Sequence, residues 1–189
     1  AVTADGAGSI VELPQLSSFG GADYDSSFTV RNGGRVNVSL GLTSLVEVSL
    51  TLGPGNWTFP TGQLTALKGG GIEVAGPSAN FAALANLDGS AISVTSGVAQ
   101  TFPALASYKA TDAIGRAFRA TGAGSRLEFP ALPTVVGGSY WSLELAAEDG
   151  GVVALPAVTG ITGSIVAVTA DGAGSIVELP QLSSFGGAD

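Results

Sequence analysis

The sequence contains no cysteine, no histidine and no methionine among its 189 residues. Without cysteine the chain can form neither a disulfide framework nor a thiolate nucleophile. Without histidine it lacks the side chain that most often serves as a general base or a metal ligand. Few residue types that commonly carry out catalysis therefore remain.

Charged residues are also scarce, at 12% of the chain, and their formal sum is −8. No cluster of lysine or arginine reverses this charge locally, which disfavours phosphate backbones and anionic lipid as partners. The apolar stretches are interrupted by Gly, Pro or charge well short of the roughly 20 residues that a membrane span needs. We expect no nucleic-acid partner and no transmembrane segment.

The sequence does contain repetition, most plainly a stretch of 23 letters that occurs twice. AVTADGAGSIVELPQLSSFGGAD fills residues 1–23 and again residues 167–189, so the second copy is offset from the first by 166 along the chain. Identity at every position indicates a copied unit. We expect residues 1–166 to be one complete repeat unit and residues 167–189 to begin the next identical unit, with no true domain boundary between them.

A shorter repeat lies inside the long one, and a repeat of this kind decides the fold class. Segments such as SIVELPQL (9–16) and GVVALPAV (151–158) share an apolar residue followed by Pro. This apolar anchor recurs seven times over the offset, a spacing of about 24 residues that lies in the range of solenoid repeats. The anchors are Leu13, Val38, Phe59, Phe81, Phe102, Phe129, Leu155 and Leu179.

Upstream of each anchor lies a short alternating segment, and period two is typical of a β-strand. Examples are FTV (28–30), IEV (72–74) and LEL (143–145). Turns rich in Gly, such as RNGG (31–34) and EDGG (148–151), follow these segments and accept positive φ. Downstream of the Pro, apolar residues three apart predict a short third side.

A coil of about 24 residues cannot bury its own apolar side chains, so we predict that successive coils stack. Stacked strands pair in parallel, which makes the fold an all-β parallel β-solenoid with seven coils per 166-residue unit. The anchors Phe59, Phe81, Phe102 and Phe129 should form an inner aromatic column, and each Pro should mark a corner. A helical third side, as in leucine-rich repeats, is disfavoured by the dense Gly, Pro, Val and Thr.

GSRLEFPALPTVVGG and GVVALPAVTGITGS resemble the LPxLTxIxG repeat of receptor L-domain-type solenoids, which are related to leucine-rich repeats. Glycine-rich versions of this pattern resemble the long repeat regions of very large bacterial cell-surface proteins, planctomycete-like ones in particular. This resemblance implies an extracellular or cell-surface location. The asparagine ladder of leucine-rich repeats is absent from most coils, so the resemblance implies no binding face.

An active site on a solenoid would need polar side chains that converge on neighbouring coils. The outward position before each anchor carries Glu12, Asn37, Thr58, Asn80, Thr101, Glu128, Ala154 and Glu178. Glu128 and Glu178 are two coils apart, roughly 9.6 Å, close to the carboxylate separation of inverting glycosidases. Ala154 between them offers no substrate contact, and both carboxylates should be solvated, so we predict no catalytic residue.

The remaining polar motifs favour structure over chemistry. Arg119 and Glu144 should form a surface ion pair between neighbouring coils. The acidic turns at 5–8, 23–25 and 148–151 match no calcium-loop pattern, and we predict no metal or cofactor. NVS (37–39) and NWT (56–58) fit the acceptor pattern for N-linked glycans.

Both ends of the chain carry an interior-type coil with no polar cap, which favours a stack that continues in both directions. We expect a structural repeat segment of a long extracellular filament, stalk or adhesin shaft, whose main partner is itself. One alternative is a carbohydrate- or partner-binding module that uses exposed Trp57, Tyr140 or Trp141. The other is a polysaccharide-processing β-helix enzyme.

Overall fold

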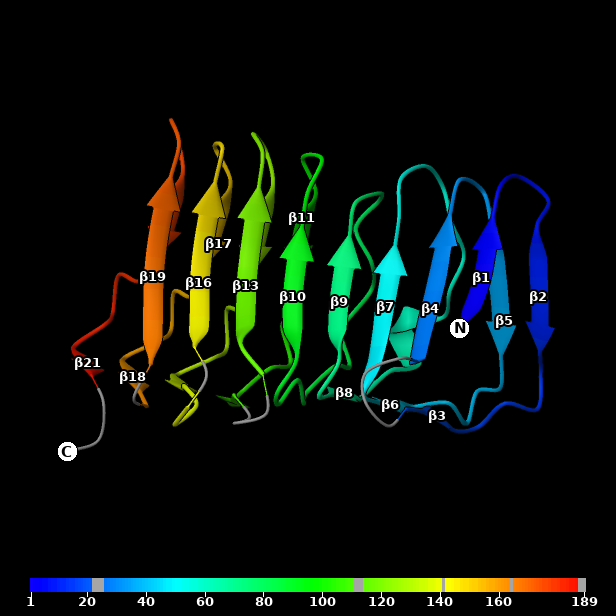
Figure 1. Cartoon of the computed structure of the whole chain (residues 1–189), viewed down its shortest axis with the longest axis horizontal. Coiled ribbons are helices and arrows are strands. Elements are labelled where there is room, and N and C mark those ends of the chain that lie inside the picture. Colours follow the sequence, from blue (N-terminus) through cyan, green and yellow to red (C-terminus); the bar gives the residue numbers. More distant parts are fainter. Residues whose placement is uncertain (22–25, 111–113, 141, 164, 187–189) are drawn as a thin grey trace.

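The computed structural model describes residues 1–21, 26–110, 114–140, 142–163 and 165–186, and in them the chain winds into a β-solenoid (Figure 1). The described residues form 21 strands and one short 3-10 helix, η1 (Thr61–Gln63). The strand pairs are parallel, as stacking of successive coils requires. The prediction of an all-β parallel solenoid is confirmed.

The longest sheet, which we call the long face, receives one strand from each coil (Figure 1). It contains the alternating segments that the sequence marks as strands. In spatial order its strands are β1 (Val2–Asp5), β4 (Ser26–Arg31), β7 (Val48–Leu52), β9 (Gly71–Val74), β10 (Ala91–Val94), β13 (Arg116–Thr121), β16 (Leu143–Glu148) and β19 (Val166–Asp171).

The other two sides of the solenoid, the second and third faces, are each built from two shorter sheets. The second face holds β2 (Ile10–Leu13), β5 (Arg35–Val38), β11 (Ala99–Thr101), β14 (Arg126–Glu128), β17 (Val152–Ala154) and β20 (Ile176–Glu178). The third face holds β3 (Phe19–Gly20), β6 (Ser44–Val46), β8 (Ala66–Lys68), β12 (Tyr108–Lys109), β15 (Thr134–Val136), β18 (Gly160–Thr162) and β21 (Ser184–Gly186).

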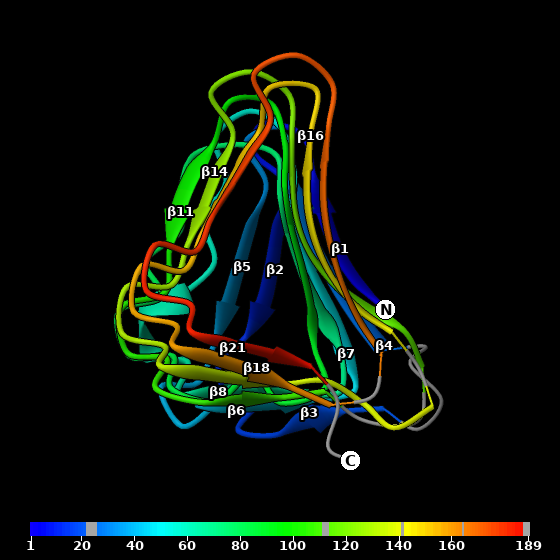
Figure 2. The same ribbon diagram turned by 90° about the vertical axis from the view of Figure 1, so that its left-hand side faces the viewer.

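We number the coils by their long-face strand, so that coil 1 holds β1–β3, coil 2 holds β4–β6 and coil 8 holds β19–β21. Coils 1 and 8 lie at opposite ends of the stack (Figure 1). Viewed along the stack, the three faces enclose a triangular cross-section (Figure 2). The inner side chains of all three faces meet in one core.

The register of the long face shows how the long repeat fits the solenoid. Starting from Val2, directly paired residues lead across the sheet in seven steps: Phe28, Leu50, Ile72, Ile92, Phe118, Leu145 and Val168. The last residue, Val168, is the sequence copy of Val2. The long repeat therefore equals a whole number of coils, and the copied strand returns to the same sheet in the same register.

Alternation along the strands separates the core from the surface. In β13, for example, Phe118 and Ala120 are fully buried while Arg119 between them faces out. Three of the four predicted aromatic anchors stack: the ring centroids of Phe81 and Phe102 are 5.1 Å apart and those of Phe102 and Phe129 are 5.4 Å apart. The fourth anchor, Phe59, packs instead on Phe28 of coil 2, at 5.1 Å.

Proline follows six of the eight anchors and lies at a bend, as predicted. In coil 1 the N–H of Leu16 donates to the carbonyl of Leu13, which closes a four-residue turn with Pro14 in its second position. That position suits the fixed φ of proline and needs no N–H donor. The same bond joins Leu182 to Leu179 in coil 8, so the turn is repeated with the sequence.

Glycine at the opposite corner lets successive coils approach closely. A Cβ atom on Gly34 would lie 2.2 Å from the carbonyl oxygen of Ala4 in the coil before it. Next to it, Asn32 and Gly33 both adopt positive φ, at 54° and 91°. The corner therefore needs glycine both for its turn and for the contact with the neighbouring coil.

The second face departs from the predicted alignment between coils 2 and 3. Leu13 pairs with Val38 as expected, but Arg35 bridges to Thr58, which places Phe59 beside Val36 and not beside Val38. Val36 is fully buried while Val38 is only partly buried, so tertiary packing prefers the earlier valine. The assignment of Val38 to the same column as Phe59 was therefore wrong.

Backbone pairing on the second face is also incomplete, because the sheet β2-β5 and the sheet β11-β14-β17-β20 are separate. Beside coil 4 the buried side chain of Gln100 takes the place of a strand. Its Oε1 accepts from the N–H of Ala79 at 2.7 Å, and its Nε2 donates to the carbonyl of Ala79 at 3.0 Å. One amide side chain thus satisfies the backbone where the coil is too short for a strand.

Candidate functional surfaces

The carboxylates that most resembled an active-site pair, Glu128 and Glu178, lie on the second face in the predicted register. Each is directly opposite Ala154 of the coil between them. The guanidinium of Arg126 lies between the two: its Nη2 is 2.7 Å from Glu178 Oε2, and its Nε is 3.4 Å from Glu128 Oε2. Sequence reasoning missed this arginine because it is separated from Glu178 by two coils.

Arg126 determines the chemistry of this pair. The hydrogen bond from its guanidinium holds the pKa of Glu178 below the ordinary value of 4.5, and a smaller effect of burial opposes this. A general acid in a glycosidase needs the opposite shift, which keeps a proton on the carboxyl group near neutral pH. The arrangement is that of an ion pair linking coils 6 and 8.

Ala154 lies in the outward row as predicted, directly opposite Glu128 and Glu178, but it is fully buried. It lies in the row between Glu128 and Glu178, which Arg126 spans. A small residue in that row leaves room for the long arginine side chain to cross the coil. The small side chain of Ala154 therefore makes room for a salt bridge.

A similar arrangement occurs on the long face around Arg119. Its Nη2 is 2.7 Å from Glu144 Oε2, which confirms the predicted pair, and its Nη1 is 3.0 Å from Glu148 Oε1. The residue directly opposite Arg119 is Ala146, which is fully buried although it faces outward. Both carboxylates therefore bind the guanidinium diagonally, two residues either side of an alanine.

Beside this ion pair the outer surface of the long face is hollowed. The hollow has a volume of about 360 Å³ and is open to solvent. Small outward residues on neighbouring strands, Gly71 and Ala91 among them, create it. Hydroxyl groups of Thr51 and Ser93 and the charged side chain of Glu73 lie around it, and Arg119 closes one side.

The three aromatic residues proposed as ligand contacts are not brought together. Tyr140 is 78% exposed, as predicted. Trp57 was expected to be exposed, but it is partly buried and packs against the core, so this expectation was wrong. Trp141 lies outside the described residues.

The acidic turns act as corners of the solenoid. Asp149 adopts a φ of 51° and Gly150 a φ of 87°, the left-handed conformations that a tight turn requires. Among the described residues, no three carboxylates gather closely enough to hold a metal ion. The predicted acidic motif at 23–25 lies outside the described residues.

The two predicted glycan acceptors differ in their surroundings. Asn37 is partly buried, and its Nδ2 donates to Glu12 Oε1 at 2.8 Å, so its amide already joins coils 1 and 2. Asn56 is exposed. In the part of the chain that the structure describes, no helix has the length and apolar character required to cross a membrane.

A polar cluster that the sequence did not reveal joins coils 1 and 2 at the edge of the long face. Asp5 accepts from Asn32 Nδ2 at 2.8 Å and from Arg31 Nε at 3.0 Å. These hydrogen bonds, the one from Asn32 first, lower the pKa of Asp5 below 3.8. The signal in the sequence is that Arg31 follows Asp5 by the length of one coil, which pairs the two directly.

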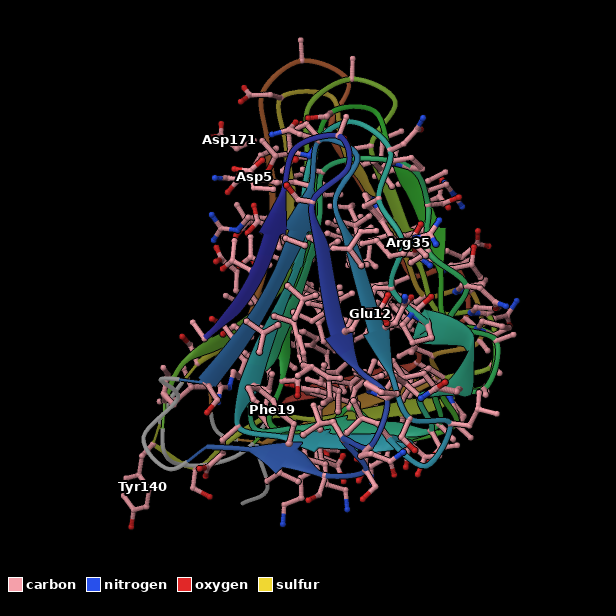
Figure 3. The ribbon with its side chains drawn as sticks, turned by 90° about the vertical axis from the view of Figure 1, so that its right-hand side faces the viewer. Asp5, Glu12, Phe19, Arg35, Tyr140 and Asp171 are labelled. Carbon is pink, nitrogen blue, oxygen red and sulfur yellow. The ribbon has the colours of Figure 1, made fainter. Side chains whose placement is uncertain are left out.

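Viewed from the N-terminal end, the first copy of the repeated sequence lies in front and its second copy lies far behind it (Figure 3). Asp5 and its copy Asp171 are at the same edge of the triangle, at the two ends of the stack. Phe19 points into the triangle, where its ring centroid is 4.5 Å from that of Phe28.

Comparison with family models, with curated proteins and with solved structures found no match to this chain.

Proposed function

We propose that this chain is a structural segment of a long extracellular filament, stalk or adhesin shaft, with no catalytic role. The observation that carries the proposal is the register of the long face. After seven coils the ladder that begins at Val2 arrives at its own copy, Val168, in the same sheet. Identical units can therefore follow one another without a break in strand pairing.

Stacking of parallel strands makes such a repeat unit both long and stiff. Seven coils at about 4.8 Å each advance roughly 34 Å per unit. Each added coil contributes both an apolar layer and backbone hydrogen bonds to its neighbour, so stability grows with the number of units. Length, stiffness and stability are the properties that a filament or stalk needs.

The main partner under this proposal is another copy of the same unit, either in one continuous chain or end to end. The described outer strands β1 and β19 each pair on one side only. Strand edges of this kind favour association with further strands. The extracellular location rests on the resemblance of the repeats to those of large bacterial surface proteins.

Immunogold electron microscopy of the cells that produce this protein tests the proposal. Antibodies raised against the purified chain should label filaments outside the cell envelope, and averaged images should show an axial repeat of about 34 Å. Labelling confined to the cell interior, or labelled compact particles without an axial repeat, would contradict it.

One observation favours carbohydrate binding as a second candidate function: the hollow on the long face, where hydroxyl groups and Glu73 surround a space of about 360 Å³. This volume is near the lower end of that of small-molecule sites. A glycan array probed with the whole chain tests it, with Ala91→Leu as the variant that fills the hollow. Binding that Ala91→Leu abolishes would support this function, whereas no binding, or binding unaffected by the variant, would eliminate it.

A further inference from the structure

Coil 2 presents a surface that receives coil 1, and the contacts on it are specific. We call this surface the coil-2 docking face; its side chains that contact coil 1 are Phe28, Arg31, Asn32 and Asn37. Arg31 Nη2 is 2.9 Å from Asp5 Oδ2, and Phe19 packs on Phe28. Backbone pairing joins the two coils on all three faces.

Coil 8 carries the same residues as coil 1 and holds them ready for the same contacts. Asp171 is the copy of Asp5 and is exposed, and no ion pair to it occurs among the described residues. Phe185, the copy of Phe19, is 54% exposed, and Val168, the copy of Val2, is 41% exposed. Within the described residues, coil 8 therefore has no downstream neighbour of the kind that the coil-2 docking face provides for coil 1.

We propose that coil 8 of one molecule binds a second copy of this chain by displacing coil 1 of that copy and occupying its coil-2 docking face. The proposal deepens the proposed function, on which it rests for the idea that the chain associates with itself. Its occupant is defined, because residues 1–21, which have the same sequence as residues 167–187, are seen bound to that face.

Direct stacking of coil 8 on an undisturbed coil 1 is less favourable. It would place Asp171 beside its own copy, Asp5. Like charges directly opposite one another destabilise a sheet. Displacement places Asp171 beside Arg31 and Asn32. Charge complementarity therefore selects the coil-2 docking face.

The number of interfaces also favours displacement. In the separate molecule seven interfaces hold eight ordered coils. In a row of copies joined by displacement, each molecule still contributes seven interfaces but orders only seven coils, because its first coil is released. The freed coil regains conformational entropy, which opposes the loss of translational freedom on association. Exchange of identical elements between copies is a low-cost route to assembly for this reason.

A reversible lock on coil 1 tests the proposal in the whole chain. Thr3 and Thr29 are directly paired and point outward, and strands about 4.8 Å apart lie within the range of a disulfide. Since the chain has no other cysteine, this is the only disulfide that a Thr3→Cys/Thr29→Cys variant can form within one molecule, and oxidation at low protein concentration favours it over bonds between molecules. We expect oxidised protein to stay monomeric in analytical ultracentrifugation, and reduced protein to form rows of copies as its concentration rises.

A matched pair of variants identifies the joint. Asp5→Ala weakens only the coil that must leave, so association should begin at a concentration about three- to tenfold lower than for the wild type. Asp171→Ala weakens only the incoming coil, so association should need a concentration higher by a similar factor. Both variants remove the same side chain from the same local sequence.

Shifts of both aspartate variants in one direction would overturn the proposal, because direct stacking of coil 8 on coil 1 predicts that either change relieves repulsion. Association that persists in the oxidised lock variant would also overturn it. The proposed function fails separately: it falls if the producing cells show no labelled filaments, even where purified molecules exchange coils as expected.

Discussion

Coils 1 and 8 have the same sequence but different surroundings, and their burial differs accordingly. Ala4 is 1% exposed, whereas its copy Ala170 is exposed. Phe19 is half-buried, whereas Phe185 is 54% exposed. Each coil has one neighbour, so the number of neighbours does not explain the difference.

The side on which the neighbour lies does explain it. Coil 1 is covered on its downstream side by coil 2, and coil 8 on its upstream side by coil 7. Phe19 and Asp5 both reach toward coil 2, where they contact Phe28 and Arg31. In coil 8 the same side chains reach toward the open end of the stack. The repeated sequence therefore has a direction: it is built to be covered from its downstream side.

The largest expected effect comes from removing the space between coils 1 and 2. In Gly34→Ala the new Cβ would meet the backbone carbonyl of Ala4 at 2.2 Å, and backbone atoms cannot move aside without breaking the ladder. We expect hydrogen-exchange protection of the β1 and β2 amides to fall at least about 100-fold, roughly 2.7 kcal/mol. Coil 1 would then resemble coil 8 in having an uncovered downstream side.

Gly71→Ala is the control for this change. Its Cβ would meet only the carbonyl oxygen of Ala91, at an ordinary distance of 3.5 Å, so protection should change little. Equal losses in the two variants would show that glycine acts through chain flexibility, and the close approach of the coils would not be the cause.

A smaller effect should distinguish the two copies of one phenylalanine. Phe19→Ala removes a ring packed against Phe28 and should destabilise coil 1 by about 2 kcal/mol, below the range for fully buried rings. Phe185→Ala removes a ring that is 54% exposed and should destabilise coil 8 by less than about 1 kcal/mol. Hydrogen exchange of the amides of each coil measures both, and equal values would contradict the directional interpretation.

The smallest effect concerns Glu178 and its copy Glu12. Glu178→Gln loses an ion pair with Arg126 whose side chains are 34% and 39% exposed, so at pH 7 we expect a loss of about 0.5 kcal/mol. Glu12→Gln keeps a carbonyl acceptor for Asn37 and should have almost no effect. Urea unfolding of both variants against the wild type measures the difference.

The pH dependence of this difference has a defined sign. Since the pKa of Glu178 is lower in the folded protein, its contribution is fully present above the ordinary value of 4.5 and is lost as the pH falls through the folded value. The gap between wild type and Glu178→Gln should therefore close on acidification to about pH 2. A gap that stays constant would mean that Arg126 does not stabilise the ionised carboxylate.

Much of the fold could be predicted because the relevant signals are local and repeated. Three features each predict one kind of local structure: the alternation around Phe118 a strand, the proline after Leu13 a bend, and the glycines near Gly34 a tight corner. Because these features recur along the chain, each prediction is supported several times. The alignment failed where coils lack this regularity. Beside Phe59 the chain lacks a second-face strand, and packing placed Val36 where the repeat pattern indicated Val38.

The surfaces were harder to predict because they depend on side chains from separate coils. The Glu128 and Glu178 columns were aligned correctly, but the reach of Arg126 across Ala154 was not visible in the sequence. An arginine side chain is long enough to cross a whole coil, so its partner can be 52 residues away. Pairing by column alone therefore underestimates such contacts.

The sequence by itself determined the solenoid, because glycine corners, proline bends and alternating strands of one coil length leave stacking as the way to bury the apolar residues. Only the tertiary structure decided which copy of the repeated opening sequence is covered and which is open. Burial depends on the side from which a neighbouring coil approaches, and two identical sequences carry no information about that side.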